Sequence, residues 1–144
     1  MKTQQRGFTL IELVVVITIL GILAAFALPR FAGLETNARV AAVQGLAGSV
    51  RAASALAHSV ALVTGAATNT TITLEGTSVD LSNSYPAATT LGIVSALQDT
   101  SGFTDNNDGT IDLTSAPTPG NCSVTYTAAP ANGSPSITTT TSGC

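Results

Sequence analysis

The chain has 144 residues and a net charge of −3, and only 9% of its residues are charged and 4% aromatic. Its length allows one modest domain. No Lys or Arg follows Arg51, which excludes a phosphate-binding face in the C-terminal half, so we expect no direct nucleic-acid binding. One histidine and two cysteines give no zinc constellation and no nucleophile–base pair, so we expect neither a cofactor nor an enzyme.

An apolar segment from Phe8 to Leu28 dominates the N-terminal part of the chain. As a helix its roughly 21 residues would extend about 31 Å, which matches the hydrocarbon core of a bilayer. Lys2 and Arg6 precede the segment and no acidic residue does. The positive-inside rule therefore predicts a cytoplasmic N-terminus and an exported C-terminal part.

Glu12 lies inside this apolar segment. A carboxylate in lipid is costly unless a partner neutralises it, so its presence needs a chemical reason. A cleaved secretory signal or a plain signal anchor is the simpler alternative. Three features argue against both alternatives: the internal position of Glu12, the length of the segment, and the helical pattern that continues beyond the small residues 24–27.

Residues Arg6 to Glu12, with the sequence RGFTLIE, closely resemble the type III signal of type IV pilins. The short leader 1–7 followed by Phe8 resembles the type IVa subgroup, and the resemblance extends to about residue 35 and includes Pro29. It implies a prepilin peptidase that cuts after Gly7 and methylates the new amino group of Phe8. It also implies a precursor in the bacterial inner membrane and later an extracellular pilus.

The resemblance gives Glu12 a role in assembly. As filament subunits stack, the Glu12 carboxylate of one copy would neutralise the Phe8 ammonium of the next. A buried ion pair need not add much net stability, but one member left alone is costly. We therefore expect the pair between subunits to act mainly as a register device. An interaction of the same two groups within one subunit is an alternative that the sequence leaves open.

One long helix is predicted from about residue 8 to 63, with residues 8–29 as the membrane and filament-core part and 30–63 as an amphipathic part. Pro29 removes one helical hydrogen bond. It would either kink an intact helix or, as the resemblance implies, mark a stretch that loses helix on assembly. The amphipathic part has apolar residues at helical spacing, namely Phe31, Leu34, Ala38, Ala42, Leu46, Val50, Ala53, Ala57 and Val60.

Residues 64–144 are rich in Thr, Ser and Gly and predict short strands at 70–74, 77–81, 109–114, 123–128 and 136–141. Glu75-Gly76 predicts a hairpin turn between the first two. A short helix is expected at 91–98, capped by Thr89 or Thr90. The fold class is therefore α+β, with one small antiparallel sheet on the second half of the long helix, which is the pilin fold that the resemblance implies.

Cys122 and Cys144 form an even pair in a part of the chain that is expected to be exported, which favours a disulfide over two free thiols. Such a bond would close a loop of about 23 residues and contribute about 3 kcal/mol. The pilin resemblance likewise implies a disulfide-bounded region at 122–144.

Asp105, Asp108 and Asp112 are weak candidates for a calcium site. Aligning Gly109 with the glycine of an EF-hand puts Thr104 first and Ser115 last, so that motif fails at both ends. Asn-Asp-Gly is also a common turn sequence. An ordinary loop and a calcium site of another type remain the two alternatives.

The resemblance implies a structural subunit that polymerises with itself, through an assembly machinery, into a type IV pilus for adhesion, twitching motility or DNA uptake. A pseudopilin of type II secretion, or a minor pilin, is the nearest alternative. An alternative of another class is a membrane-anchored extracytoplasmic module that binds a ligand. That module predicts that Glu12 can be replaced without consequence.

Overall fold

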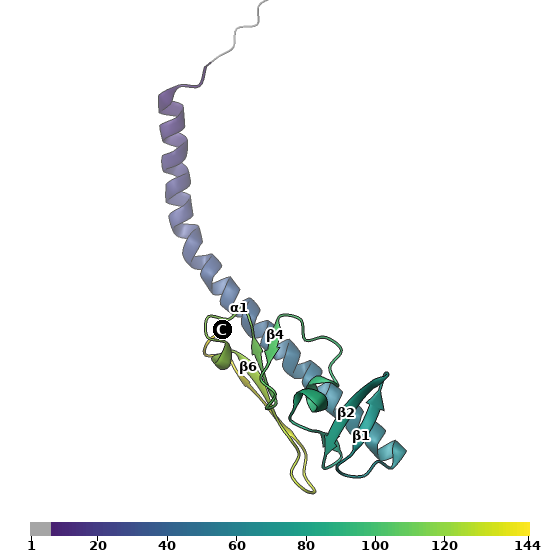
Figure 1. Ribbon diagram of the computed structural model, residues 1–144. Helices are drawn as coiled ribbons and strands as arrows, with labels where there is room; N and C mark the ends of the chain where they lie inside the picture. The colour runs from purple at the N-terminus through teal and green to yellow at the C-terminus, as the bar shows by residue number, and fades with distance from the viewer. Residues whose placement is uncertain (1–6) are drawn as a thin grey trace, which may run out of the picture. The chain divides into compact units, whose positions relative to one another are not determined.

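The structure is a computed structural model that describes residues 7–144, except for the side chains of residues 28–32. The chain divides into two compact units, with the boundary between Thr36 and Asn37. One helix, α1 (Leu10–Thr64), belongs to both units and is the long ribbon in Figure 1. The predicted long helix is therefore confirmed.

The C-terminal end of α1 is set by Gly65. This residue has a φ of 63°, in the left-handed region that glycine adopts without steric cost. The Gly65 N–H donates to the carbonyl of Leu62 at 3.3 Å, and the Ala66 N–H donates to that of Ala61 at 2.9 Å. This pair of hydrogen bonds is a Schellman motif, which satisfies carbonyls that the helix end leaves open.

In the second unit, one face of α1 is buried, and it differs in part from the predicted stripe. Leu34, Ala38 and Ala42 are exposed, which contradicts the prediction for the front of the stripe. The sheets cover α1 only from about residue 40. Because this part of the helix is rich in alanine, the spacing of apolar residues does not indicate where along the helix burial begins. The buried apolar residues are Val43, Leu46, Ala47, Val50, Ala53, Ala57 and Ala61.

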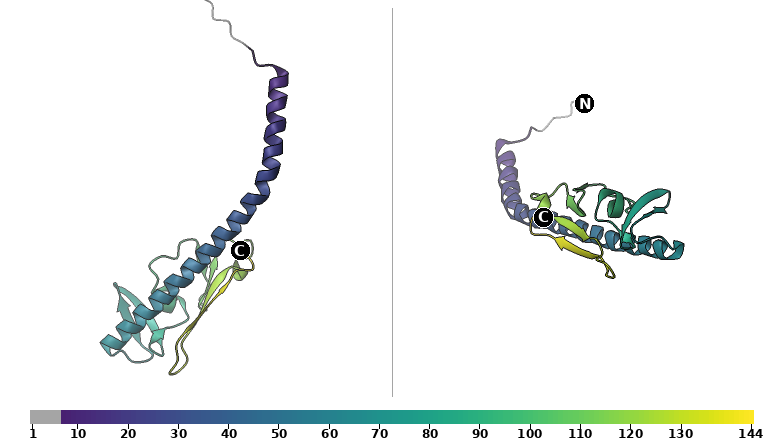
Figure 2. Two further views of the ribbon diagram at one scale, coloured as in Figure 1. Left: turned by 180° about the vertical axis from the view of Figure 1, so that it is seen from behind. Right: turned by 60° about the horizontal axis from the view of Figure 1, so that its bottom comes forward.

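Two antiparallel sheets stand where one was predicted. Their strands are β1 (Thr71–Leu74), β2 (Thr77–Ser82) and β3 (Tyr85–Pro86) in the first, and β4 (Phe103–Asp105), β5 (Thr110–Leu113), β6 (Ser123–Thr127) and β7 (Ser136–Thr140) in the second. Strand order follows the sequence in both sheets. Figure 2 shows the sheets alongside the C-terminal part of α1. The very short β3 and β4 were not predicted, which is why the division was missed.

Tight turns join neighbouring strands. Glu75 and Gly76 have φ values of 48° and 87°, as the predicted hairpin between β1 and β2 requires. Asn83 and Ser84, with φ values of 53° and 65°, form a second such turn between β2 and β3. The connection from β6 to β7 is longer, and its residues 130–134 are exposed.

The predicted helix at 91–98 is a single π-type turn, η1 (Thr90–Val94). Thr89 makes no capping hydrogen bond, so the predicted cap is also wrong. Gly92 explains the unusual turn, because a Cβ there would lie 2.1 Å from the carbonyl oxygen of Ala87. The close backbone approach places Ile93 fully in the core. A 3₁₀ turn, η2 (Pro119–Asn121), precedes β6.

Two apolar clusters lie along the buried face of α1. One gathers Val50, Ile93, Ile111 and Tyr126, and the other is built around Ala57 with residues of β1 and β2. Tyr126 on β6 donates its hydroxyl to the carbonyl of Pro86 on β3 at 2.8 Å, which joins the two sheets. Burial raises the pKa of the Tyr126 phenol.

Candidate functional site

The start of α1 is organised by Thr9 and Glu12. The Thr9 N–H and hydroxyl both donate to Glu12 Oε2, at 2.8 and 2.7 Å. In return, the Glu12 N–H donates to Thr9 Oγ1 at 3.4 Å. This reciprocal arrangement is a capping box, which satisfies backbone N–H groups at a helix start. Sequence analysis missed the role of Thr9, although Thr-x-x-Glu ahead of an apolar run is the signature of that motif.

Gly7 and Phe8 precede the helix and are exposed. Among the described residues, and apart from the chain neighbours of Gly7, no atom lies within 4 Å of the position that a Cβ on Gly7 would occupy. Phe8 and Glu12 both line a shallow depression of about 400 Å³, together with Ile11, Val15 and Val16. The structure thus brings Phe8 and Glu12 together, with Gly7 next to Phe8 in the chain, whereas Pro29 lies further along α1 with its side chain outside the described residues.

The residues after Glu12 form an apolar helix that nothing in the described chain covers. The segment Leu10–Ala27 has a mean hydropathy of 2.7 and is 0% buried. A second segment of α1, Gly33–Thr64, has a mean hydropathy of 1.4 and is 39% buried, as expected for the core helix of the second unit. By length and composition both segments could cross a bilayer, but of the two only Leu10–Ala27 has no part buried against the rest of the described chain.

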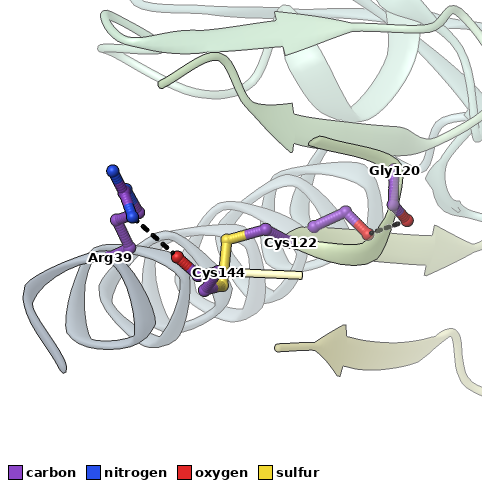
Figure 3. Close-up of a disulfide and its surroundings, with 5 residues drawn as sticks. Arg39, Gly120, Cys122 and Cys144 are labelled. Carbon is purple, nitrogen blue, oxygen red and sulfur yellow. Dashed lines mark hydrogen bonds between the residues drawn. A yellow bond between two sulfur atoms is a disulfide. The ribbon is translucent and has the colours of Figure 1, made fainter. Parts of the chain in front are cut away.

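Cys122 and Cys144 form a disulfide, with their Cα atoms 4.9 Å apart. This bond confirms the predicted pairing. Figure 3 shows the bond beside α1, where Arg39 Nη1 donates to the carbonyl oxygen of Cys144 at 2.9 Å. A further hydrogen bond from the Gly143 N–H to the Asn121 carbonyl, at 2.8 Å, holds residue 143 against η2. The disulfide and Arg39 therefore fasten the segment after β7 to both the sheet and the helix.

Asp105, Asp108 and Asp112 belong to the β4–β5 hairpin. Asp105 Oδ1 accepts the Asn107 N–H at 2.9 Å, and Asp108 Oδ1 accepts the Thr110 N–H at 2.8 Å. Asp112 Oδ2 accepts the side-chain amide of Asn106 at 3.0 Å. In the described part of the chain, no group of three or more His, Cys, Asp or Glu residues is placed to hold a metal ion. The bonds that Asp105 and Asp108 accept from the backbone two residues further on are those of Asx turns.

Comparison with known proteins gives a family match at the N-terminus and similarity to several curated proteins. Residues 2–28 match the family profile of the prokaryotic N-terminal methylation motif. The chain is 54% identical over 52 residues to the type IV narrow pilus major component PilA5 of Thermus thermophilus, covering 36% of this chain and 45% of that protein. It is 45% identical over 53 residues to a type IV major fimbrial protein FimA of Dichelobacter nodosus, covering 37% and 34% respectively.

The matched region spans less than half the length of these relatives. No solved structure matches the chain. The match to the methylation motif contains Gly7, Phe8 and Glu12, and the structure brings the last two together at the start of α1. The chain is therefore similar to type IV major pilins, with the methylation motif at its N-terminus, and its long helix and antiparallel sheets form a pilin-like α+β arrangement.

Proposed function

We propose that the chain is a structural subunit that polymerises into a type IV pilus. The observation that carries this proposal is the methylation motif at the head of an apolar helix that is 0% buried over Leu10–Ala27. A helix that is apolar on all sides needs lipid or other helices around it. A bilayer before assembly and neighbouring copies after assembly would supply these two environments in turn.

Processing would come first. A prepilin peptidase would remove the leader 1–7 by cutting after Gly7 and would methylate the amino group of Phe8. The exposure of both residues ahead of the helix suits this cleavage. The precursor would wait in the bacterial inner membrane with its N-terminus in the cytoplasm, since basic residues precede the apolar segment. The assembly machinery would then move residues 8–29 into the filament core, leaving 64–144 as the globular part.

Glu12 would change partners during assembly. In the described chain its carboxylate is held by the Thr9 N–H and hydroxyl. These hydrogen bonds lower the cost of keeping a carboxylate in an apolar helix before a cation arrives. In the filament the methylated ammonium of Phe8 on a neighbouring copy would approach the same carboxylate, and the pair would fix the axial register of the subunits. Pro29 would give the helix a place to bend or lose hydrogen bonds in the packed filament.

The test is a Glu12→Ala variant, with Thr18→Ala as a matched control in the same segment. We expect the Glu12 variant to insert in the membrane at the normal level but to yield few or no sheared filaments, because the register pair is lost. The control should assemble normally. Normal piliation with Glu12→Ala would contradict the register role and would favour a membrane-anchored binding module.

Mass spectrometry of purified filaments tests the processing step separately. We expect the mature chain to begin at methylated Phe8. A filament subunit that still carries Met1 would contradict cleavage after Gly7.

A further inference from the structure

A groove of about 660 Å³ opens on the surface of the second unit, along one side of α1. Its apolar part includes Leu56, which is 52% exposed. Two carboxylates, those of Glu75 and Asp99, also line it. An apolar groove with acidic groups suits a cationic side chain with a long aliphatic stem, such as arginine.

Both carboxylates are held in place. Gln98 Nε2 donates to Glu75 Oε2 at 3.0 Å, and the Ser101 N–H donates to Asp99 Oδ1 at 2.8 Å. The hydrogen bonds from Ser101 also lower the pKa of Asp99, so this group is ionised at neutral pH. Within the described residues, neither carboxylate has a basic partner. The groove is therefore a preorganised anionic site without an internal cation.

The described side chains of the second unit include two cations, Arg39 and Arg51. Arg39 donates to the carbonyl of Cys144. Arg51 is exposed on α1, and no hydrogen bond or ion pair to it occurs among the described residues. At about 100° per residue, Arg51 points roughly 140–160° away from Leu56 and Ser49, which line the groove. The cation and the acidic groove therefore face different sides of the same helix.

We propose that Arg51 of one copy docks into the groove of a second copy, with its guanidinium at Glu75 and Asp99. This proposal rests on the proposed function and adds a specific contact between globular units. Because the two complementary patches lie on different sides of one molecule, the contact is head-to-tail and repeats from copy to copy. Charge complementarity of this kind fixes orientation and register more than it adds raw affinity.

The test compares filaments from the full chain with those of three variants. Arg51→Glu places a carboxylate against the acidic groove, and Glu75→Lys places an ammonium against Arg51. We expect each reversal to lower the yield of sheared filaments by about fivefold, as for a partly exposed charge pair. The combined Arg51→Glu/Glu75→Lys variant restores opposite charges and should recover most of the yield.

Controls separate docking from folding. Arg51→Lys keeps the positive charge and should assemble within about twofold of the wild type. Yields are normalised to membrane-inserted precursor with an intact Cys122–Cys144 bond. If a reversal variant does not accumulate, Arg51→Gln is used in its place. We expect it to lower the filament yield as well.

The outcomes distinguish the two proposals. Reversals that leave the yield unchanged, or a combined variant that recovers nothing, overturn the docking contact while the pilus function stands. Absence of filaments from the wild type, under conditions where its precursor is processed, overturns both proposals.

Discussion

The two units of the chain differ in where their apolar residues lie. In the first unit the large apolar side chains are exposed, for example Leu10 at 80% and Phe26 at 76%. In the second unit, which is rich in Thr and Ser, Val50 and Tyr126 are almost completely buried, at 0% and 1%. The more hydrophobic unit is thus the one without a core of its own. The contrast teaches that hydrophobicity marks where burial is needed, while the partner that supplies it can lie outside the chain.

The strongest test of this difference between the units is to produce the second unit without the first. A fragment of residues 37–144 should be soluble without detergent and cooperatively folded, because both apolar clusters and the disulfide lie within it. The full chain should need detergent or a bilayer. Circular dichroism and sedimentation of the fragment check this prediction, and an aggregated or unfolded fragment would contradict the division at residue 36.

Removal of the disulfide should have the next largest effect, and only on the second unit. Replacing both Cys122 and Cys144 by Ser should cost about 2–4 kcal/mol of the free energy of unfolding, since the unfolded chain is no longer constrained. Chemical denaturation of the 37–144 fragment measures this loss. An unchanged denaturation midpoint would show that Arg39 and the sheet alone hold the segment after β7.

The link between the sheets through Tyr126 should matter less. Tyr126→Phe removes the hydroxyl that bonds to the Pro86 carbonyl and should cost about 1–2 kcal/mol, because a buried acceptor loses its donor. Thr127→Val on the exposed end of β6 serves as the control. Equal stability of Tyr126→Phe and the wild type would rule out a contribution from this hydrogen bond.

The same residue predicts a pH dependence. The pKa of Tyr126 is raised in the folded state by burial, so the unfolded chain ionises first. The stabilising effect is fully present below about pH 10, the usual pKa of tyrosine, and is lost as the pH rises toward the folded-state pKa. The stability difference between wild type and Tyr126→Phe should therefore shrink above pH 10. Denaturation curves between pH 8 and about 11 follow this difference.

The smallest of the expected effects concerns the first unit and follows from replacing Thr9. Thr9→Ala removes the hydroxyl that donates to Glu12, whereas Thr9→Ser keeps it. We expect the alanine variant to fray the first turn of α1 in detergent micelles and the serine variant to retain it. Amide exchange of residues 10–13 measures the fraying. Equal exchange in both variants would show that the capping box does not hold the helix start.

Several features could be predicted from the sequence because their signals are local. The apolar run gave the long helix, Glu75-Gly76 gave the first hairpin, and an even pair of cysteines gave the disulfide. The division into two sheets could not be predicted, since β3 has two residues and β4 has three. The π-type turn depends on the close approach of Gly92 to the carbonyl of Ala87, which is a local contact but one that helical or strand periodicity does not indicate.

The candidate site shows the same division between local and distant signals. The proximity of Phe8 and Glu12 follows from their spacing, and the sequence also contains the Thr-x-x-Glu signature of the capping box that was missed. Arg39 is different, because its bond to Cys144 joins residues 105 positions apart in the sequence. Roles that depend on such distant pairs appear only when the chain is folded.

The exposed tip of the β6–β7 hairpin offers a practical handle. Residues 130–134 project from the second unit in Figure 1 and are all exposed. Exposed loop tips tolerate insertions best, so a short epitope or a dye-accepting tag placed there would leave both apolar clusters intact. Fibres built from tagged copies could then be followed on living cells by fluorescence microscopy.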